Sequence, residues 1–364
     1  MKGIVLSDSD SRDYRIAVLP GDGIGPELID SALAVLRVVA SAEGSPRLSF
    51  VEEEAGARCY LRSGENISAA TLQRLREDYD GILKGPVGLP DVRNPDGTEA
   101  GLLGGVLRTQ LDTFANVRPV RLLPGVRTPV THPAEAIDYV IVRENTEGLY
   151  ASRGNGVGNQ QAASDVLFMT RYGIERVVRF AFETAQRRAR AVDRTPRVTC
   201  VDKSNVLKSF ALFRAIFDEV AARHPDVEAD HLYADAAAQA LVADPARFDV
   251  LVMENFLGDV LSDLGAGTVG GLGMCPAGNV GHHYAYFEPV HGSAPDIAGT
   301  GHANPTSQIL AAAMLLEHLG EATAAQRIRN AVAAAYSEGA IRLDSLGRPE
   351  NKTAGVTRAI LDRF

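Results

Sequence analysis

One stretch near the start of the chain narrows the folds that it can adopt. Residues 16–27 read IAVLPGDGIGPE, an apolar run that leads into three glycines and a proline. Residues 28–40 follow with apolar side chains at helical spacing. A strand, a glycine-rich turn and an amphipathic helix in this order predict an α/β fold that opens with a β–α unit.

The same stretch is similar to the glycine fingerprint of dinucleotide-binding Rossmann folds, but its spacing differs. Gly21, Gly23 and Gly25 give G-x-G-x-G, and Pro26 stands where G-x-G-x-x-G needs its third glycine. Three successive glutamates at residues 52–54 lie at roughly the distance of the acidic residue that follows such a fingerprint. A tight strand-to-helix turn with proline at the helix start explains these residues as well. The motif alone does not establish a nucleotide site.

Length and composition indicate a large globular chain. Its 364 residues exceed the usual size of one domain, so we expect two lobes that share a cleft. The net charge of −9 argues against nucleic-acid or anionic-membrane partners, although local arginine clusters can still bind anionic substrates. Cys59, Cys200 and Cys275 lack metal or redox spacing, which is typical of a reducing compartment. Since neither a signal-peptide pattern nor an apolar run of membrane-spanning length is found, we expect a cytoplasmic protein.

Further strands and helices alternate along the chain. We expect strands at residues 48–51, 81–83, 137–142, 197–201 and 248–253, and helices at residues 68–77, from 171 onward, 256–264, 311–319 and 322–335. Residues 85–105 are rich in Gly and Pro and predict a loop that lines the cleft. Residues 151–164 are polar and glycine-rich, which predicts a loop or a protruding hairpin.

Two aspartates in GDVLSD are placed for a common role. Asp259 and Asp263 are four residues apart on a predicted helix, so both carboxylates leave the same face. A solvated acidic face is the simpler interpretation. Apolar Val260, Leu261 and Leu264 surround the pair and favour the other interpretation, a site for a hard cation such as Mg²⁺ or Mn²⁺.

Three arginines and two further polar residues are candidates for substrate chemistry. Arg108, Arg118 and Arg143 each lie near the end of an apolar or aromatic stretch. One such arginine usually forms a structural salt bridge, whereas three suit the bidentate binding of a di- or tricarboxylate. Tyr150 and Lys203 lie just past predicted strands. They are either ordinary surface residues or catalytic groups, and a catalytic role would need pKa values lowered by burial and nearby positive charge.

Six segments carry a closer resemblance. In chain order they read VLPGDGIGPE, LRTQLDTFANVRP, VIVRENTEGLY, VDKSNVL, NFLGDVLSDLGAGTVGGLG and YFEPVHGSAPDIAGTGHANPTSQIL. Together they closely resemble the isocitrate/3-isopropylmalate dehydrogenase family of β-decarboxylating oxidoreductases, nearest to its NAD-linked members. The resemblance implies a two-lobed α/β fold, not a Rossmann fold, with a central mixed sheet flanked by helices. It also implies a large cofactor-binding domain of residues 1–113 and 270–364. Residues 114–269 would form a small dimerisation and catalytic domain with a protruding arm near residues 151–170.

The resemblance implies roles for residues at matching positions. Tyr150 would protonate the enolate carbon after CO₂ leaves, and Lys203 would take part in proton transfer from the substrate hydroxyl. Substrate carboxylates would be bound by Arg108, Arg118 and Arg143, and Mg²⁺ or Mn²⁺ by Asp235, Asp259 and Asp263. NAD would be held by Ile24, His291, Gly292, Ser293, Ala294, Asp296, Ile297 and Asn304. Lys203 and Asp235 would reach into the neighbouring subunit's site, which implies an obligate homodimer.

The segment TEAGLLGGVLR before Arg108 bears on the substrate. The order of Leu102 and Leu103 is similar to isopropylmalate enzymes, whereas an ungapped count back from Arg108 puts Gly104 and Gly105 at the selective positions. LKGP and RENTEGLY are more similar to isocitrate, homoisocitrate, tartrate and D-malate enzymes. We expect 3-isopropylmalate or another 3-alkylmalate as substrate, because a third carboxylate has no obvious partner beyond Lys84. Homoisocitrate, isocitrate, tartrate and D-malate are the alternatives.

Two further positions affect the functional assignment. Asp296 followed by Ile297 resembles NAD-linked members, and a carboxylate there can accept hydrogen bonds from ribose hydroxyls. Glu254 stands where the family usually has proline or a small residue. A non-catalytic regulatory subunit of such an enzyme is the alternative of another class. Since all of the matched catalytic, arginine and metal positions are retained, we favour the enzyme.

Overall fold

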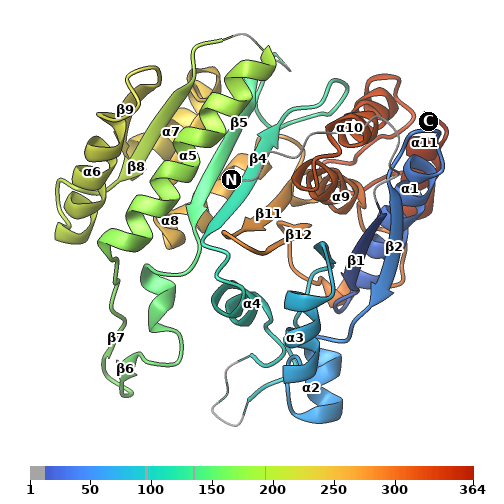
Figure 1. Cartoon of the computed structure of the whole chain (residues 1–364), viewed down its shortest axis with the longest axis horizontal. Helices are drawn as coiled ribbons and strands as arrows, with labels where there is room; N and C mark the ends of the chain where they lie inside the picture. Colours follow the sequence, from blue (N-terminus) through green and yellow to red (C-terminus); the bar gives the residue numbers. More distant parts are fainter. Residues whose placement is uncertain (1–12, 95–96, 98, 134–135, 193) are drawn as a thin grey trace.

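One mixed sheet runs through the whole molecule. The computed structural model describes residues 13–94, 97, 99–133, 136–192 and 194–364. Ten strands of the described residues form a single sheet in the order β2-β1-β3-β12-β11-β4-β5-β10-β8-β9 (Figure 1). β4 and β11 run antiparallel to their neighbours, whereas the strands on either side of this centre pair in parallel. A mixed sheet flanked by helices is the fold class that we expected.

The elements alternate along the chain. The strands of the large sheet are Asp13–Leu19 (β1), Arg47–Glu52 (β2), Gly81–Lys84 (β3), Ala115–Arg121 (β4), Asp138–Glu144 (β5), Arg197–Asp202 (β8), Glu228–Tyr233 (β9), Val250–Met253 (β10), Pro276–Val280 (β11) and Ala285–Pro289 (β12). The helices are Gly25–Ala40 (α1), Ala57–Ser63 (α2), Ala69–Glu77 (α3), Gly104–Gln110 (α4), Arg171–Val192 (α5), Lys208–Ala221 (α6), Ala234–Ala243 (α7), Asn255–Gly267 (α8), Thr306–His318 (α9), Ala322–Ser337 (α10) and Lys352–Leu361 (α11). Short 3-10 turns are Leu149–Ser152 (η2), Pro245–Arg247 (η3), Leu272–Met274 (η4) and Pro295–Ile297 (η5).

Helices cover both faces of the sheet, and the strands accordingly carry apolar side chains on both faces. In β10, Val250 and Val252 belong to the apolar cluster under α5 and α6, while Leu251 and Met253 belong to the cluster on the opposite face. Successive side chains of a strand point to opposite faces, so a strand covered on both sides is apolar throughout. This explains why the apolar runs at residues 81–83 and 248–253 predicted strands correctly.

The order of the strands separates two halves of the sheet. β1, β2, β3, β11 and β12 form one half, and β4, β5, β8, β9 and β10 form the other. The halves meet where β11 pairs with β4, with Gly278 opposite Val117. We propose that this seam is the boundary between a large domain of residues 1–113 and 270–364 and a small domain of residues 114–269. Residues 1–12 lie outside the described part.

A hairpin extends from the small half. Val157–Gly158 (β6) pairs with Ala163–Ser164 (β7) in a separate two-stranded sheet, which projects below the body in Figure 1. Its strands are exposed, as the polar, glycine-rich sequence there predicts. Within the described ranges, no helix has the length and apolar character needed to cross a membrane.

Candidate active site

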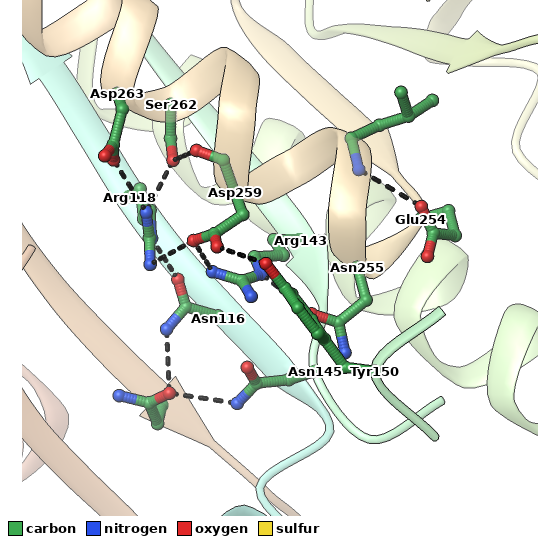
Figure 2. A network of polar contacts seen from close by, with 12 residues as sticks. Asn116, Arg118, Arg143, Asn145, Tyr150, Glu254, Asn255, Asp259, Ser262 and Asp263 are labelled. Atoms are coloured by element: carbon green, nitrogen blue, oxygen red, sulfur yellow. Dashed lines mark hydrogen bonds and ion pairs between the residues drawn. The ribbon is translucent and has the colours of Figure 1, made fainter. Parts of the chain in front are cut away.

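Asp259 is the centre of a polar cluster built from four elements. It lies on α8, and its carboxylate contacts Arg118 of β4, Arg143 of β5 and Tyr150 of η2 (Figure 2). Nη2 of Arg118 lies 3.4 Å from Oδ1 of Asp259, and Nη1 of Arg143 forms an ion pair with the same oxygen. The Tyr150 hydroxyl donates to Oδ2 at 2.8 Å. The structure thus brings Asp259 together with three residues that lie more than a hundred positions earlier in the sequence.

Strand pairing explains why the two arginines converge. β4 and β5 are antiparallel neighbours with Asn116 opposite Arg143, so Arg118, two residues along from Asn116, points to the same face as Arg143. That face is covered by α8. Gly258 lets the helix approach, since a Cβ there would lie 2.5 Å from Cγ of Arg143.

The arginines are buried together at an energetic cost. Arg143 is 1% exposed and Arg118 is 5% exposed. Burial, reinforced by repulsion from Arg108 and Arg118, lowers the pKa of Arg143 to about 9. Burial also lowers the pKa of Arg118. Burial of Asp259 opposes its ionisation, but Arg143 and Arg118 outweigh it and hold the pKa of this carboxyl below its usual value. The site carries more buried positive charge than its aspartates balance, and a bound polyanion would relieve the repulsion.

Asp263 is the second aspartate of the predicted metal pair. Its Oδ1 lies 3.3 Å from Nη1 of Arg118, which also donates to Ser262. Burial and the neighbouring Asp259 raise the pKa of Asp263, against the attraction of Arg118. Asp263 is 52% exposed and Asp259 36%, so both carboxylates are accessible.

Arg108 approaches the cluster from α4 with an unused donor. Its Nε is buried and finds no hydrogen-bond partner among the described residues. A Cβ on Gly104 would lie 4.0 Å from this Nε, so the start of α4 lies directly beside the guanidinium. An unsatisfied buried donor is costly, and a substrate carboxylate would satisfy this one.

The predicted selective positions differ in their surroundings. The Leu103 side chain is completely buried in the apolar cluster beneath α4, so in this structure it faces the core. Leu102 is partly buried, and its Cδ2 approaches Gly88. Gly105 faces Arg153, whose Nη1 would lie 2.5 Å from a Cβ on this glycine.

Lys203 and Asp235 lie apart from the Asp259 cluster. Lys203 follows β8 and Asp235 lies in the first turn of α7, and Nζ of Lys203 donates to Oδ1 of Asp235 at 2.6 Å. This hydrogen bond lowers the pKa of Asp235. The Asp235 side chain is 73% exposed and that of Lys203 is 33% exposed.

Two of the three predicted metal ligands fit a hard cation. Asp259 and Asp263 present accessible carboxylate oxygens from one helix face, the donor type that Mg²⁺ and Mn²⁺ prefer. Across the described residues, no group of three or more His, Cys, Asp or Glu side chains could hold a metal ion. Within the described part of one chain, the three predicted metal ligands are therefore not brought together.

The predicted cofactor residues surround the turn between β1 and α1. Ile24 donates its backbone N–H to the Ser293 carbonyl at 2.8 Å. Gly23 has φ +55°, and a Cβ there would lie 2.0 Å from the same carbonyl. Ile24 also packs with Ala294 and Ile297. The close approach of two loops explains the glycine spacing, which a Rossmann pyrophosphate loop does not share.

Asp22 organises this turn and was missed by sequence reasoning. Its carboxylate is fully buried and accepts backbone N–H groups from Ala57, Arg58 and Gly88 at 2.8 to 3.1 Å. The buried carboxylate ties the turn to two loops. The position of Asp22 between two glycines of a tight turn was the sequence feature that could have indicated this role.

The remaining cofactor candidates include buried and exposed groups. His291 lies beside Gly292 and shares a hydrogen bond of 3.1 Å with Ser307, and burial lowers its pKa. The Asn304 side chain is buried, and it donates to Met274 and Tyr336. Asp296 is exposed in η5.

A chain of polar groups behind the arginines was not foreseen. Asn279 links Asn116 and Asn145 through its Oδ1, at 2.7 and 2.9 Å, and donates to Glu288. Glu288 accepts from Nζ of Lys84 at 2.5 Å. Since Lys84 is 2% exposed and paired in this way, it is not a free cation for a third substrate carboxylate.

The chain is similar to known proteins in both sequence and fold. Residues 15–360 match the isocitrate/isopropylmalate dehydrogenase family. A 3-isopropylmalate dehydrogenase of Corynebacterium aurimucosum is 45% identical over 89% of this chain and 93% of its own length, and one of Streptomyces coelicolor is 45% identical over 90% and 93%. Among solved structures, isocitrate dehydrogenase from Methylococcus capsulatus superposes with a TM-score of 0.83 at 38% identity, covering 96% of this chain and 99% of its own. A β-decarboxylating dehydrogenase from Thermococcus kodakarensis gives 0.77 at 37% identity, with 96% of each chain covered.

Proposed function

The chain belongs to the isocitrate/isopropylmalate dehydrogenase family of decarboxylating dehydrogenases, and from this premise we propose that its substrate is 3-isopropylmalate or another 3-alkylmalate. The reaction would depend on NAD and on Mg²⁺ or Mn²⁺. The observation that carries the proposal is the buried cluster in which Arg118, Arg143 and Tyr150 meet on Asp259. The 45% identity to several 3-isopropylmalate dehydrogenases supports the alkylmalate as substrate.

The residues of the chain divide the chemistry. Arg108, Arg118 and Arg143 would bind and orient the two carboxylates, which neutralises part of their mutual repulsion. When bound, the metal supplies Lewis-acid stabilisation of charge on the 2-oxygen and the nicotinamide supplies a hydride acceptor. Asp259 and Asp263 would hold the metal. Burial and the hydrogen bond to Asp259 raise the pKa of Tyr150, so the expectation of a lowered pKa for this residue was wrong. The hydroxyl keeps its proton at neutral pH and would deliver it to C3 after CO₂ leaves.

A second copy of the chain would complete the site. Lys203 and Asp235 are exposed and bonded to each other rather than to the Asp259 cluster. We propose that they serve the site of a neighbouring chain, so that the working unit is a homodimer with shared sites. Lys203 would take the proton of the substrate hydroxyl, and Asp235 would be the third metal ligand.

The cofactor proposal rests on the η5 turn. Ile24 and Ile297 pack together near Asp296, an exposed carboxylate that can accept hydrogen bonds from ribose hydroxyls. The 2′-phosphate of NADP would be repelled at that place, so NAD is favoured. His291, Gly292, Ser293, Ala294 and Asn304 would complete the cofactor loop. The three cysteines are buried and unpaired, which supports a cytoplasmic location as a further proposal.

A second candidate substrate is a malate with a carboxyalkyl substituent, as in isocitrate. Arg153 lies beside Gly105, and its guanidinium carbon is 5.9 Å from the centre of the Tyr150 ring. Its guanidinium forms no ion pair with any described residue, so it is available to an anion. Lys84, the cation considered from the sequence, is occupied by Glu288. The 38% identity to an isocitrate dehydrogenase is compatible with this candidate.

A substrate panel tests the proposal. Purified protein with Mn²⁺ and NAD⁺ is offered 3-isopropylmalate, isocitrate, homoisocitrate, D-malate and tartrate, and NADH is followed by absorbance. We expect the highest kcat/KM with 3-isopropylmalate. A higher value with isocitrate or homoisocitrate would replace the alkylmalate by the second candidate, and no NADH with any of the five would overturn the proposed function.

A further inference from the structure

Glu254 is a buried carboxylate at the junction of two catalytic elements. It is 0% exposed and is the N-cap residue of α8. Its Oε2 accepts the backbone N–H of Leu257 at 3.1 Å, the helix-capping bond. Its Oε1 accepts the backbone N–H of Leu149, also at 3.1 Å, from the η2 turn. One side chain therefore joins the helix of Asp259 to the turn of Tyr150.

The contact between turn and helix is close. Gly148 has φ +80°, and a Cβ there would lie 2.1 Å from Oε1 of Glu254. Asn255 adds a second link, because its Nδ2 donates to the Glu147 carbonyl at 2.9 Å while its Oδ1 accepts from Nε of Arg143. The backbone of residues 147–149, directly before Tyr150, is thus held against the first residues of α8.

We propose that Glu254 is a positioning residue, which sets the place of Tyr150 relative to Asp259 for proton delivery to C3. The inference rests on the proposed function, in which Tyr150 is the proton donor. A small side chain at position 254 can cap α8, but it is too short to reach Leu149 as well. Glu254 itself touches no reacting atom.

The chemical step identifies what should change. Hydride transfer and loss of CO₂ leave an enolate with a double bond between C2 and C3. The electrons of this double bond take the proton of the Tyr150 hydroxyl at C3, and the oxygen on C2 forms the carbonyl. The phenolate that remains regains a proton from solvent. NADH has already formed at this point, so a misplaced Tyr150 slows turnover but not the first formation of NADH.

Three substitutions separate positioning from helix capping. Glu254→Ala removes both contacts, and Glu254→Gln keeps the length but replaces one acceptor oxygen by an amide. Glu254→Asp keeps an N-cap side chain of high preference but is one methylene shorter, so it should retain the cap and lose Leu149. Ser68→Ala is the matched control, because Ser68 caps α3 through Thr71 without contact to the Asp259 cluster.

The experiment compares the first turnover with steady state. In rapid mixing with Mn²⁺, NAD⁺ and 3-isopropylmalate, Glu254→Ala and Glu254→Asp should form the first NADH at the wild-type rate. Their steady-state kcat should then fall about 10-fold or more, and Tyr150→Phe should show a larger fall. Glu254→Asp should unfold near the wild-type temperature, and Ser68→Ala should keep the wild-type kcat. A wild-type kcat in Glu254→Asp, or equal losses in both phases, would overturn the inference.

A second measurement does not depend on the substrate. With 3-fluorotyrosine in place of tyrosine, the ¹⁹F resonance of position 150, assigned by its absence in Tyr150→Phe, should shift or broaden in Glu254→Asp and stay unchanged in Ser68→Ala. An unshifted resonance in Glu254→Asp contradicts the positioning role. Absence of wild-type activity with every malate would instead refute the proposed function, and the resonance would still test Glu254.

Discussion

The Asp259 cluster and the Lys203–Asp235 pair are opposite in construction. The first is fixed by four elements, and its two strand arginines are almost completely buried. The second has one ion pair at the surface, between a strand end and a helix start. Exposed ion pairs contribute little to stability, typically ~0.2–1 kcal/mol. The Lys203–Asp235 ion pair therefore does not by itself fix the two side chains in position.

The contrast shows which part of the site one chain can build. Burying several like charges is tolerated in the Asp259 cluster because surrounding packing and the aspartate hold them in place. Among the described residues, the Lys203–Asp235 pair is not enclosed in this way, since the side chains are 33% and 73% exposed. We infer that its catalytic surroundings come from a second chain, and each prediction below tests one side of this contrast.

The largest effect should come from Asp259. Asp259→Asn keeps the shape but removes the charge that faces Arg118, Arg143 and the metal, and we expect kcat/KM to fall at least ~10³-fold, several kcal/mol of lost charge stabilisation. NADH absorbance with Mn²⁺ provides the measurement. Asp362→Asn, at an exposed residue near the C-terminus, should leave activity unchanged. Wild-type activity of Asp259→Asn after EDTA treatment would remove Asp259 from the metal site.

Cofactor choice tests the loop that one chain builds around Ile24. We expect a preference for NAD⁺ over NADP⁺ of at least ~100-fold in kcat/KM, which corresponds to about 2.7 kcal/mol. The double substitution Asp296→Lys and Ile297→Tyr should narrow or invert this preference. Kinetics with each cofactor below saturation measure it, and similar wild-type values for both would show that Asp296 does not select the ribose.

Arg153 should have a smaller effect, on the preference between 3-isopropylmalate and isocitrate. Arg153→Ala is expected to raise the ratio of kcat/KM for 3-isopropylmalate over isocitrate about 10-fold, the value of ~1.4 kcal/mol for one exposed charge-assisted contact. Arg121→Ala, which removes an exposed arginine on the outer end of β4, is the control. An unchanged ratio would mean that Arg153 does not face the C3 substituent.

The pH dependence of kcat/KM tests the charge of Arg143 in the buried Asp259 cluster, and the expected change is gradual. Because the pKa of Arg143 is lowered to about 9, this guanidinium loses its charge above that pH and binds the substrate carboxylate less well. kcat/KM of the free enzyme should therefore decline above pH 9, at most tenfold per pH unit. The folded pKa lies below the unfolded one, so the charge costs stability at neutral pH and its loss above pH 9 restores it. A flat kcat/KM to pH 10 would contradict this assignment.

Local patterns predicted much of the fold, and pairing decided the rest. The strand and helix around Asp259 follow from an apolar run and helical spacing. β11 lacks such a pattern, because Pro276, Gly278 and Asn279 interrupt the apolar run, and it forms between β4 and β12, which both pair with it. The convergence of Arg118 and Arg143 depends on the register of β4 and β5, which no local pattern contains.

The candidate residues show the same limit. Lys84 is neutralised by Glu288, 204 positions later in the chain, so its availability could not be judged from neighbours. Glu254 stood out in the sequence as unusual, but its contact with the Leu149 N–H depends on the turn at Gly148, more than a hundred positions earlier. Sequence resemblance supplied the residue types, and tertiary contacts determined which of them are free.

Subunit complementation tests most directly whether the two regions serve different sites. Lys203→Met and Tyr150→Phe proteins, each expected to lack steady-state turnover, are unfolded together, refolded as a mixture and assayed at steady state with NAD⁺, Mn²⁺ and the best malate. If Lys203 serves the neighbour's site, each mixed dimer holds one intact site and one doubly altered site. Random pairing then restores about a quarter of the wild-type activity. No activity above that of the separate variants, in a sample shown to contain mixed dimers, would mean that each chain uses its own Lys203.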